Sequence, residues 1–149
     1  MSQVPNLLYE KVAASQFYEE RYTHGYMDEW PVEKKQRVFS LIRQLDLPAR
    51  GKALDIGCGN GVFTDVIQQA LPGWEVYGAE ISPTAVAHAR ERYPQCQFFV
   101  ASDERIKTQQ FDFIFSHHVL EHVYNVDDFF TELQPQCSAA ARMLHICPC

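Results

Sequence analysis

The segment that most constrains the fold is a glycine-rich loop, DIGCGNG, at residues 55–61. A short apolar run precedes this loop and a helical pattern follows it, so Gly57, Gly59 and Gly61 can form a tight turn that lets a ligand approach the backbone. A dinucleotide-binding fingerprint would have its third glycine where Val62 stands, and no Gly-Lys-Ser/Thr sequence of a Walker loop follows. The sequence therefore predicts a strand, a ligand-binding turn and a helix.

Strand and helix patterns alternate along the chain. Apolar runs predict strands at residues 52–57, 75–81, 96–102, 111–116 and 141–147, and amphipathic or capped segments predict helices at 32–47, 61–71, 82–93 and 125–133. Parallel strands need crossover connections, which are usually helical and right-handed. The predicted fold class is therefore α/β, a doubly wound and mostly parallel sheet with helices on both faces.

We predict a single domain over residues 1–149, with residues 1–30 as an N-terminal cap. The length suits one globular domain, and no repeat, low-complexity tract or linker interrupts the chain. The cap is rich in aromatic side chains, which include Tyr18, Tyr22, Tyr26 and Trp30. Two interpretations of this segment stay open: it closes over a ligand, or it packs as an ordinary capping helix.

The composition points away from nucleic acid and membranes. The formal charge is −6 and the isoelectric point is near 5.4, which disfavours a broad basic surface for nucleic acid or anionic lipid. No apolar run approaches the roughly 20 residues that span a bilayer, and the N-terminus lacks the regions of a signal peptide. We therefore expect a cytoplasmic protein whose partners are small molecules or proteins. The five cysteines are odd in number and irregularly spaced, so we expect reduced thiols.

Three carboxylates fall where predicted strands end. Asp55 ends the first strand, Glu80 ends the second, and Asp103 follows the third beside Ser102. The carboxyl ends of parallel strands form the ligand edge of such a sheet, and a carboxylate after the second strand can accept hydrogen bonds from both hydroxyls of a ribose. Acidic groups there, with no Lys or Arg in the loop, suit a nucleoside that lacks phosphates and carries positive charge. S-adenosylmethionine has that character.

Three linked motifs, ALDIGCGNGVFT, VYGAEIS and FDFIFSHHVLEHV, resemble those of class I S-adenosylmethionine-dependent methyltransferases over about residues 50–147. The resemblance implies S-adenosylmethionine as cofactor. It also implies that Gly57, Cys58 and Gly59 line the methionine part of the cofactor, that Glu80 holds the ribose, that Asp103 faces the adenine amino group, and that His117 lies near the methionine end. The full predicted cofactor-binding set adds Asp55, Ile81 and Ser102. The alternative is structural, with turn glycines and solvated carboxylates at strand ends.

The histidine-rich segment SHHVLEHV, residues 116–123, admits several interpretations. His118, Glu121 and His122 spell the H-x-x-E-H motif of a zinc peptidase. Only 27 residues follow His122, and an apolar strand ends at the motif, so we reject the peptidase. Some O-methyltransferases of the resembled class hold a divalent ion through E-x-x-E-H, but here His118 replaces the first glutamate.

We predict no metal site, because the ligand set of this segment is mixed and no fourth protein ligand is identifiable. Glu121 and His122 can have a purely structural role. Alternatively, His118 and His122 can act as catalytic acid or base, since imidazole titrates near neutrality. We take His118 and His122 as the candidate catalytic residues.

These observations together predict an S-adenosylmethionine-dependent methyltransferase that acts on a small-molecule acceptor. Two alternatives stay open: a non-catalytic S-adenosylmethionine-binding scaffold or regulatory module, and a nicotinamide-dependent oxidoreductase. Members of the resembled class usually continue with two more strands, so we expect the strand order 3-2-1-4-5, with residues 142–147 as an exposed hydrophobic edge. We also expect weak turnover, and either self-association through this edge strand or a disordered tail.

Overall fold

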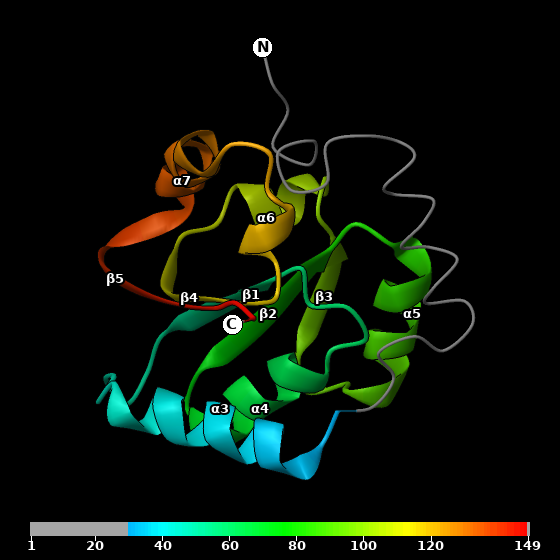
Figure 1. Ribbon diagram of the computed structural model, residues 1–149, viewed down its shortest axis with the longest axis vertical. Coiled ribbons are helices and arrows are strands. Elements are labelled where there is room, and N and C mark those ends of the chain that lie inside the picture. The colour runs from blue at the N-terminus through cyan, green and yellow to red at the C-terminus, as the bar shows by residue number, and fades with distance from the viewer. Residues whose placement is uncertain (1–29, 149) are drawn as a thin grey trace.

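The computed structural model describes residues 30–148, which form a parallel sheet with helices on both sides (Figure 1). The strands are β1 (Lys52–Ile56), β2 (Glu75–Glu80), β3 (Gln97–Val100), β4 (Phe111–His117) and β5 (Cys137–Ile146). The helices are α3 (Val32–Gln44), α4 (Val62–Ala70), α5 (Pro83–Arg92), α6 (Glu104–Lys107) and α7 (Val126–Leu133), with single 3-10 turns η1 (Leu120–His122) and η2 (Gln134–Gln136).

The sheet has the order β3-β2-β1-β4-β5, and every neighbouring pair of strands is parallel. The predicted α/β class and strand order are therefore confirmed. In Figure 1, α3 and α4 lie on one side of the sheet and α6 and α7 lie on the other. Because β1 is the central strand, the glycine loop that follows it opens at the middle of the carboxyl edge of the sheet.

The side chains of β4 contribute to two hydrophobic cores, and the irregular register between Phe111 and Phe113 interrupts their strict alternation. Phe113 and Phe115 pack in the layer with α3, α4 and α5, whereas Phe111 and Ile114 pack in the layer with α6 and α7. All four side chains are fully buried. A parallel strand that is buried on both faces has a nearly continuous apolar sequence, which explains the FDFIF run. The same burial fixes the register of β4, because a slip by one residue would exchange the two faces.

The start of β5 differs from the sequence-based expectation. The strand begins at Cys137 rather than near residue 141, and its register against β4 is irregular. Asp112 stabilises this irregularity, because Oδ1 accepts a hydrogen bond from the Ser138 hydroxyl at 2.7 Å and Oδ2 accepts one from the Lys52 amide at 3.0 Å. The first half of β5 consists of small side chains, so the apolar pattern of the sequence reveals only its second half.

β5 forms one edge of the sheet, and its exposure is mixed. Met143 is 38% exposed, whereas Leu144 and Ile146 are partly buried against the layer of α3, α4 and α5. Self-association through this strand stays a prediction. The predicted cap lies outside the described residues except for Trp30. In the described part of the chain, no helix combines the length and apolarity that crossing a membrane requires.

Gly61 joins the glycine loop to α4 and cannot easily be replaced. Its φ is 89°, in the left-handed region that strains residues with a side chain. A Cβ atom at this position would lie 2.8 Å from the ring of Phe98, which is itself buried on β3. Backbone conformation and packing therefore both require glycine here.

We predict that Gly61→Ala lowers the free energy of unfolding by roughly 2–4 kcal/mol, because backbone strain and overpacking each contribute about 1–3 kcal/mol. Urea denaturation followed by circular dichroism measures the change. Ala87→Gly on the exposed face of α5 is the control, with an expected loss of about 1 kcal/mol from helix propensity alone. A Gly61→Ala variant as stable as the parent would show that the loop adapts to a side chain.

Candidate functional site

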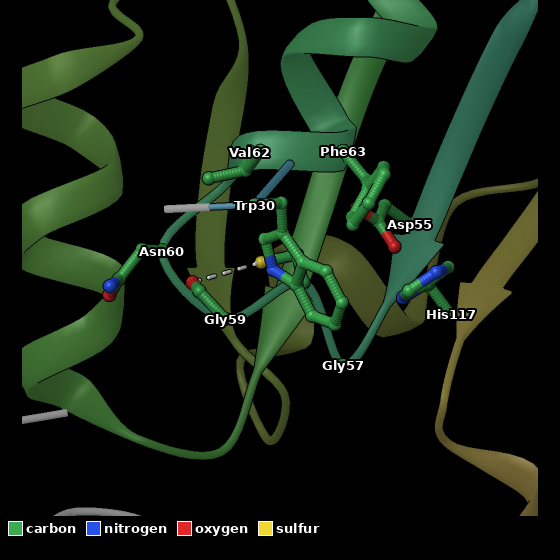
Figure 2. Close-up of a pocket in the computed structure, with 9 residues that line it drawn as sticks. Trp30, Asp55, Gly57, Gly59, Asn60, Val62, Phe63 and His117 are labelled. Atoms are coloured by element: carbon green, nitrogen blue, oxygen red, sulfur yellow. Dashed lines mark hydrogen bonds between the residues drawn. The ribbon is translucent and has the colours of Figure 1, made fainter. Parts of the chain in front are cut away.

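A hollow opens beside the glycine loop at the carboxyl ends of β1 and β4 (Figure 2). The residues that line it are Trp30, Asp55, Gly57, Cys58, Gly59, Asn60, Val62, Phe63 and His117. Five of these residues belong to the set that the sequence predicts for cofactor binding. The fold therefore brings together Asp55 and the loop from the end of β1 and His117 from the end of β4.

The glycine loop is tied to the neighbouring strand β2 through its backbone. The amides of Gly57 and Cys58 both donate to the carbonyl oxygen of Ala79, at 2.7 and 3.1 Å. The φ values of Gly57 and Gly59 are 69° and 56°, so the turn relies on left-handed backbone at both positions. The loop is thus held in one conformation at the centre of the sheet edge.

Glu80 braces the loop from the end of β2. Its side chain is only 1% exposed, Oε1 accepts a hydrogen bond from the Gly59 amide at 3.0 Å, and Oε2 accepts one from the Ser82 amide at 2.9 Å. Hydrogen bonds to a carboxylate are stronger than bonds between neutral groups. Each carboxylate oxygen can accept two hydrogen bonds, so this bracing is compatible with a contact to a ligand hydroxyl.

Asp55 is a buried carboxyl group beneath the loop. It is 2% exposed, and the Thr64 hydroxyl on α4 donates to its Oδ2 at 2.7 Å. Burial, reinforced by the charge of Glu80 and opposed by the Thr64 hydrogen bond, raises the pKa of Asp55 to about 8. Burial also raises the pKa of the adjacent Cys58 thiol well above its usual value. Both groups are therefore mainly uncharged at neutral pH.

Aromatic rings gather around His117. Its imidazole stacks on Phe63 with centroids 4.2 Å apart and on His118 with centroids 4.1 Å apart, and Trp30 meets it edge-on at 4.9 Å. Burial lowers the pKa of His117 to about 4, with further lowering by the charges of His118 and Lys34, so the ring is neutral at pH 7. Within the described part of the chain, the buried Nδ1 atom of His117 has no hydrogen-bond partner. A buried polar atom of this kind is costly unless a ligand or water satisfies it.

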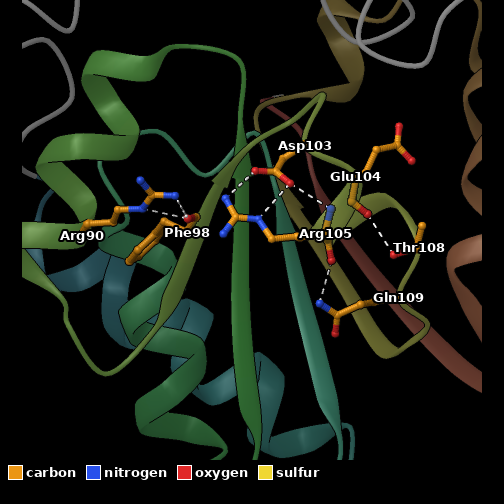
Figure 3. A network of polar contacts seen from close by, with 7 residues as sticks. All are labelled: Arg90, Phe98, Asp103, Glu104, Arg105, Thr108 and Gln109. Atoms are coloured by element: carbon orange, nitrogen blue, oxygen red, sulfur yellow. Dashed lines mark hydrogen bonds and ion pairs between the residues drawn. The ribbon is translucent and has the colours of Figure 1, made fainter.

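The predicted adenine contact, Asp103, does not line the hollow and lies at the start of α6 (Figure 3). Its Oδ1 accepts hydrogen bonds from the Arg105 amide at 2.8 Å and Nε at 3.2 Å, and its Oδ2 accepts one from Nη2 at 2.8 Å. Hydrogen bonding to Arg105 lowers the pKa of Asp103 to about 2, so it is ionised at neutral pH. The Arg105 guanidinium also lies 4.8 Å from the centroid of Phe99. Of the other two residues that the sequence predicts on this side of the cofactor site, Ser102 is exposed and Ile81 is partly buried.

The H-x-x-E-H residues do not share one face of a helix. His118 has a φ of 59° and precedes the single turn η1, which contains Glu121 and His122. His122 Nε2 lies 3.8 Å from Glu121 Oε2, and half of the His122 side chain is exposed. Among residues 30–148, no three potential ligand side chains come together in a way that could hold a metal ion. The paired helical histidines of a zinc peptidase are therefore not formed here.

Sequence reasoning missed the contribution of the first turn of α4. Phe63 supplies one face of the ring stack, and Thr64 supplies the hydrogen bond to Asp55. The position of these two residues in the sequence could have indicated their role, because the helix that follows a glycine loop presents its first turn to that loop. Trp30 stood out only as one of several aromatic residues of the predicted cap, and the structure places it at the hollow.

Residues 54–137 match a protein family described as the methyltransferase domain. Trans-aconitate 2-methyltransferase of Escherichia coli (strain K12 / DH10B) is 29% identical to this chain over 116 residues, which cover 74% of this chain and 46% of that protein. The chain thus spans about half the length of the curated relatives that it matches.

Two solved structures share the fold. A plantazolicin methyltransferase in complex with a pentazolic desmethyl analogue and S-adenosylhomocysteine superimposes with a TM-score of 0.65 at 20% identity, over 94% of this chain and 55% of that chain. Coclaurine N-methyltransferase bound to N-methylheliamine and S-adenosylhomocysteine also gives a TM-score of 0.65, at 16% identity, over 74% of this chain and 35% of that chain.

We predict that Glu80→Ala lowers the free energy of unfolding by roughly 2–5 kcal/mol, because the buried amides of Gly59 and Ser82 would each lose their acceptor at about 1–3 kcal/mol. Denaturant titration measures the loss. The control is Glu91→Ala, at an exposed position near the end of α5. It removes the same side chain without these hydrogen bonds and should change the free energy of unfolding by less than about 0.5 kcal/mol. Equal stability of the two variants would contradict the bracing role of Glu80.

Proposed function

The chain belongs to the methyltransferase domain family, and on that premise we propose that it is an S-adenosylmethionine-dependent methyltransferase. The observation that carries the proposal is the glycine loop after β1, held by the buried carboxylate of Glu80 at the end of β2. This arrangement offers an acceptor for ribose hydroxyls beside a loop without side-chain bulk. A nicotinamide-dependent oxidoreductase is disfavoured, because Val62 replaces the third glycine of its fingerprint.

The residues around the hollow fit a cofactor that carries positive charge. Neither Lys nor Arg is among the residues that line it, and the aromatic rings of Trp30 and Phe63 are uncharged. Glu80 would hold the ribose, and the loop from Gly57 to Gly59 would adjoin the methionine part. The unsatisfied Nδ1 of His117 supports the proposal, because a ligand would supply its partner.

The adenine side of the site would be formed by Ile81, Ser102 and Asp103. Asp103 is a carboxylate at neutral pH, paired with Arg105, so it can accept a hydrogen bond from the adenine amino group. The carboxylate has acceptor capacity for both contacts, since each oxygen can take two hydrogen bonds. Ile81 offers partly buried apolar surface at the end of β2.

Methyl transfer requires alignment and exclusion of water more than covalent chemistry by the protein. The bound cofactor supplies the methyl group and its sulfonium leaving group. Trp30, His117 and His118 would shield this part of the site from water, because their rings pack against one another. His118 and His122 stay the candidates for taking a proton from the acceptor, since both follow β4 in the chain and His118 stacks on His117, which lines the hollow.

We propose a small molecule as the methyl acceptor. Trans-aconitate and coclaurine appear in the names of similar enzymes, and both are small molecules. A cytoplasmic location, a single domain with residues 1–30 as its cap, and pairing through the edge of β5 are further proposals that these observations leave open to test.

We predict that the chain binds S-adenosylhomocysteine and does not bind NADH in calorimetric titration. Glu80→Gln, which replaces one acceptor oxygen with an amide group, should weaken S-adenosylhomocysteine binding by roughly 1.5–3 kcal/mol, because it removes a hydrogen bond to a charged group. Glu91→Gln serves as the control and should bind like the parent. Preference for NADH, or undiminished binding by folded Glu80→Gln, would contradict the assigned site.

We predict that methyl transfer by this chain survives treatment with EDTA. His118 lies before η1 with left-handed backbone, and His122 lies in the single turn η1 beside Glu121, so the motif does not form the paired helical ligands of a zinc site. Turnover is measured with tritiated cofactor over a panel of small acceptors, before and after chelation. Loss of turnover with EDTA that manganese, zinc or magnesium restores would show that a metal ion takes part.

A further inference from the structure

Three stacked rings form a column beside the hollow, and His118 lies at its end. His117 stacks on Phe63 with centroids 4.2 Å apart at 28°, and on His118 with centroids 4.1 Å apart at 11°. Phe63 and His118 make no ring contact with each other in the described part of the chain, so they cover opposite faces of His117. Trp30 lies alongside and meets all three rings edge-on. The column therefore starts on α4 and ends at the outer face of His118, whose side chain is partly exposed.

The backbone at His118 is fixed in an unusual conformation. Its φ is 59°, in the left-handed region that residues other than glycine seldom adopt. The His118 amide donates to the carbonyl oxygen of Ile146 at the end of β5, at 2.7 Å. Strained backbone persists only where the surrounding structure holds it, and it is typical of active sites and ligand-binding sites. His118 is thus held by the ring stack on one side and by β5 on the other.

We propose that the outer face of His118 stacks on a planar, conjugated group of the methyl acceptor. The inference rests on the proposed function and names the class of small molecule that the site would take, an aromatic or heteroaromatic acceptor. Aromatic rings prefer offset-stacked or edge-on partners, and the column already uses both arrangements. The ring nitrogens lie at the edge of the imidazole, so stacking on its face is compatible with His118 as an acid or base.

The position of the column favours the acceptor over the cofactor as the stacking partner. The methionine part of the cofactor, which carries the methyl group, would adjoin the loop from Gly57 to Gly59, and His117 lines the hollow at this loop (Figure 2). A planar group on the outer face of His118 would lie one ring farther along the column, next to that methyl group. The adenine, which is the planar group of the cofactor, is assigned to the side of Ile81 and Asp103.

Matched pairs of small molecules that differ in planarity test the proposal. Phenol is compared with cyclohexanol, and benzoate with cyclohexanecarboxylate, by NMR titration in the presence of excess S-adenosylhomocysteine. The aromatic member of each pair should bind roughly threefold to tenfold more tightly, because stacking adds to apolar burial. Burial alone would favour the cyclohexyl member, which has the larger apolar surface. Stacking should also shift the Hδ2 and Hε1 resonances of His118 upfield.

Three outcomes of this titration would overturn the proposal. They are equal or weaker binding of the aromatic members, absence of binding by both aromatic members, and His118 resonances that stay unshifted when an aromatic member binds.

Variants locate the stacking surface. His118→Asn removes the ring, and asparagine tolerates left-handed backbone. This variant should therefore lose the preference for the aromatic members and bind S-adenosylhomocysteine like the parent. His118→Phe keeps a planar ring at the end of the column and should retain the preference. The control is His88→Asn, which removes an exposed imidazole on α5 and should behave like the parent in both titrations.

The outcomes separate this inference from the proposed function. A preference that persists in His118→Asn would overturn the inference, because another ring would then bind the probes. Both readouts are measured on the parent chain, so the parent decides the matter even if a variant fails to fold. Binding of S-adenosylhomocysteine without a preference within the pairs would remove the inference alone. Failure of S-adenosylhomocysteine to bind the parent would remove the proposed function and the inference together.

Discussion

The site depends on one buried carboxylate that joins three parts of the chain. Glu80 sits at the end of β2, its Oε1 holds the glycine loop at Gly59, and its Oε2 holds the start of α5 at Ser82. A buried charge is tolerated only when hydrogen bonds compensate its lost hydration. The amides of Gly59 in the loop and Ser82 at the start of α5 supply these hydrogen bonds. The carboxylate and the two segments that it joins therefore stabilise each other.

The ionisable groups on the two sides of Glu80 differ in charge. Burial keeps Asp55 and His117 mainly uncharged at neutral pH, while Asp103 at the other side of the edge is ionised and paired with Arg105. The two sides thus differ: a hollow without a charged side chain lies on one side of Glu80, and the exposed ion pair of Asp103 with Arg105 lies on the other. This difference supports the proposal of a nucleoside that carries a cationic amino-acid group over a dinucleotide with bridging phosphates.

Much of this arrangement could be predicted from the sequence, because it depends on local patterns. The alternation of strands and helices, the glycine loop and the position of Glu80 at a strand end follow from local patterns, whereas the strand order is what the resemblance to class I methyltransferases implies. The ring stack could not be predicted, because Trp30, Phe63 and His117 come from three separate segments that only the fold brings together. α6 escaped prediction because four residues show no helical period, and the start of β5 escaped because its side chains are small.

The most direct test of the account is a crystal structure of the chain grown with S-adenosylhomocysteine. The account predicts the ribose hydroxyls on Glu80, the adenine toward Asp103 and the methionine part beside the loop from Gly57 to Gly59. Ligand density at another place on the sheet, or a ribose that does not contact Glu80, would contradict it.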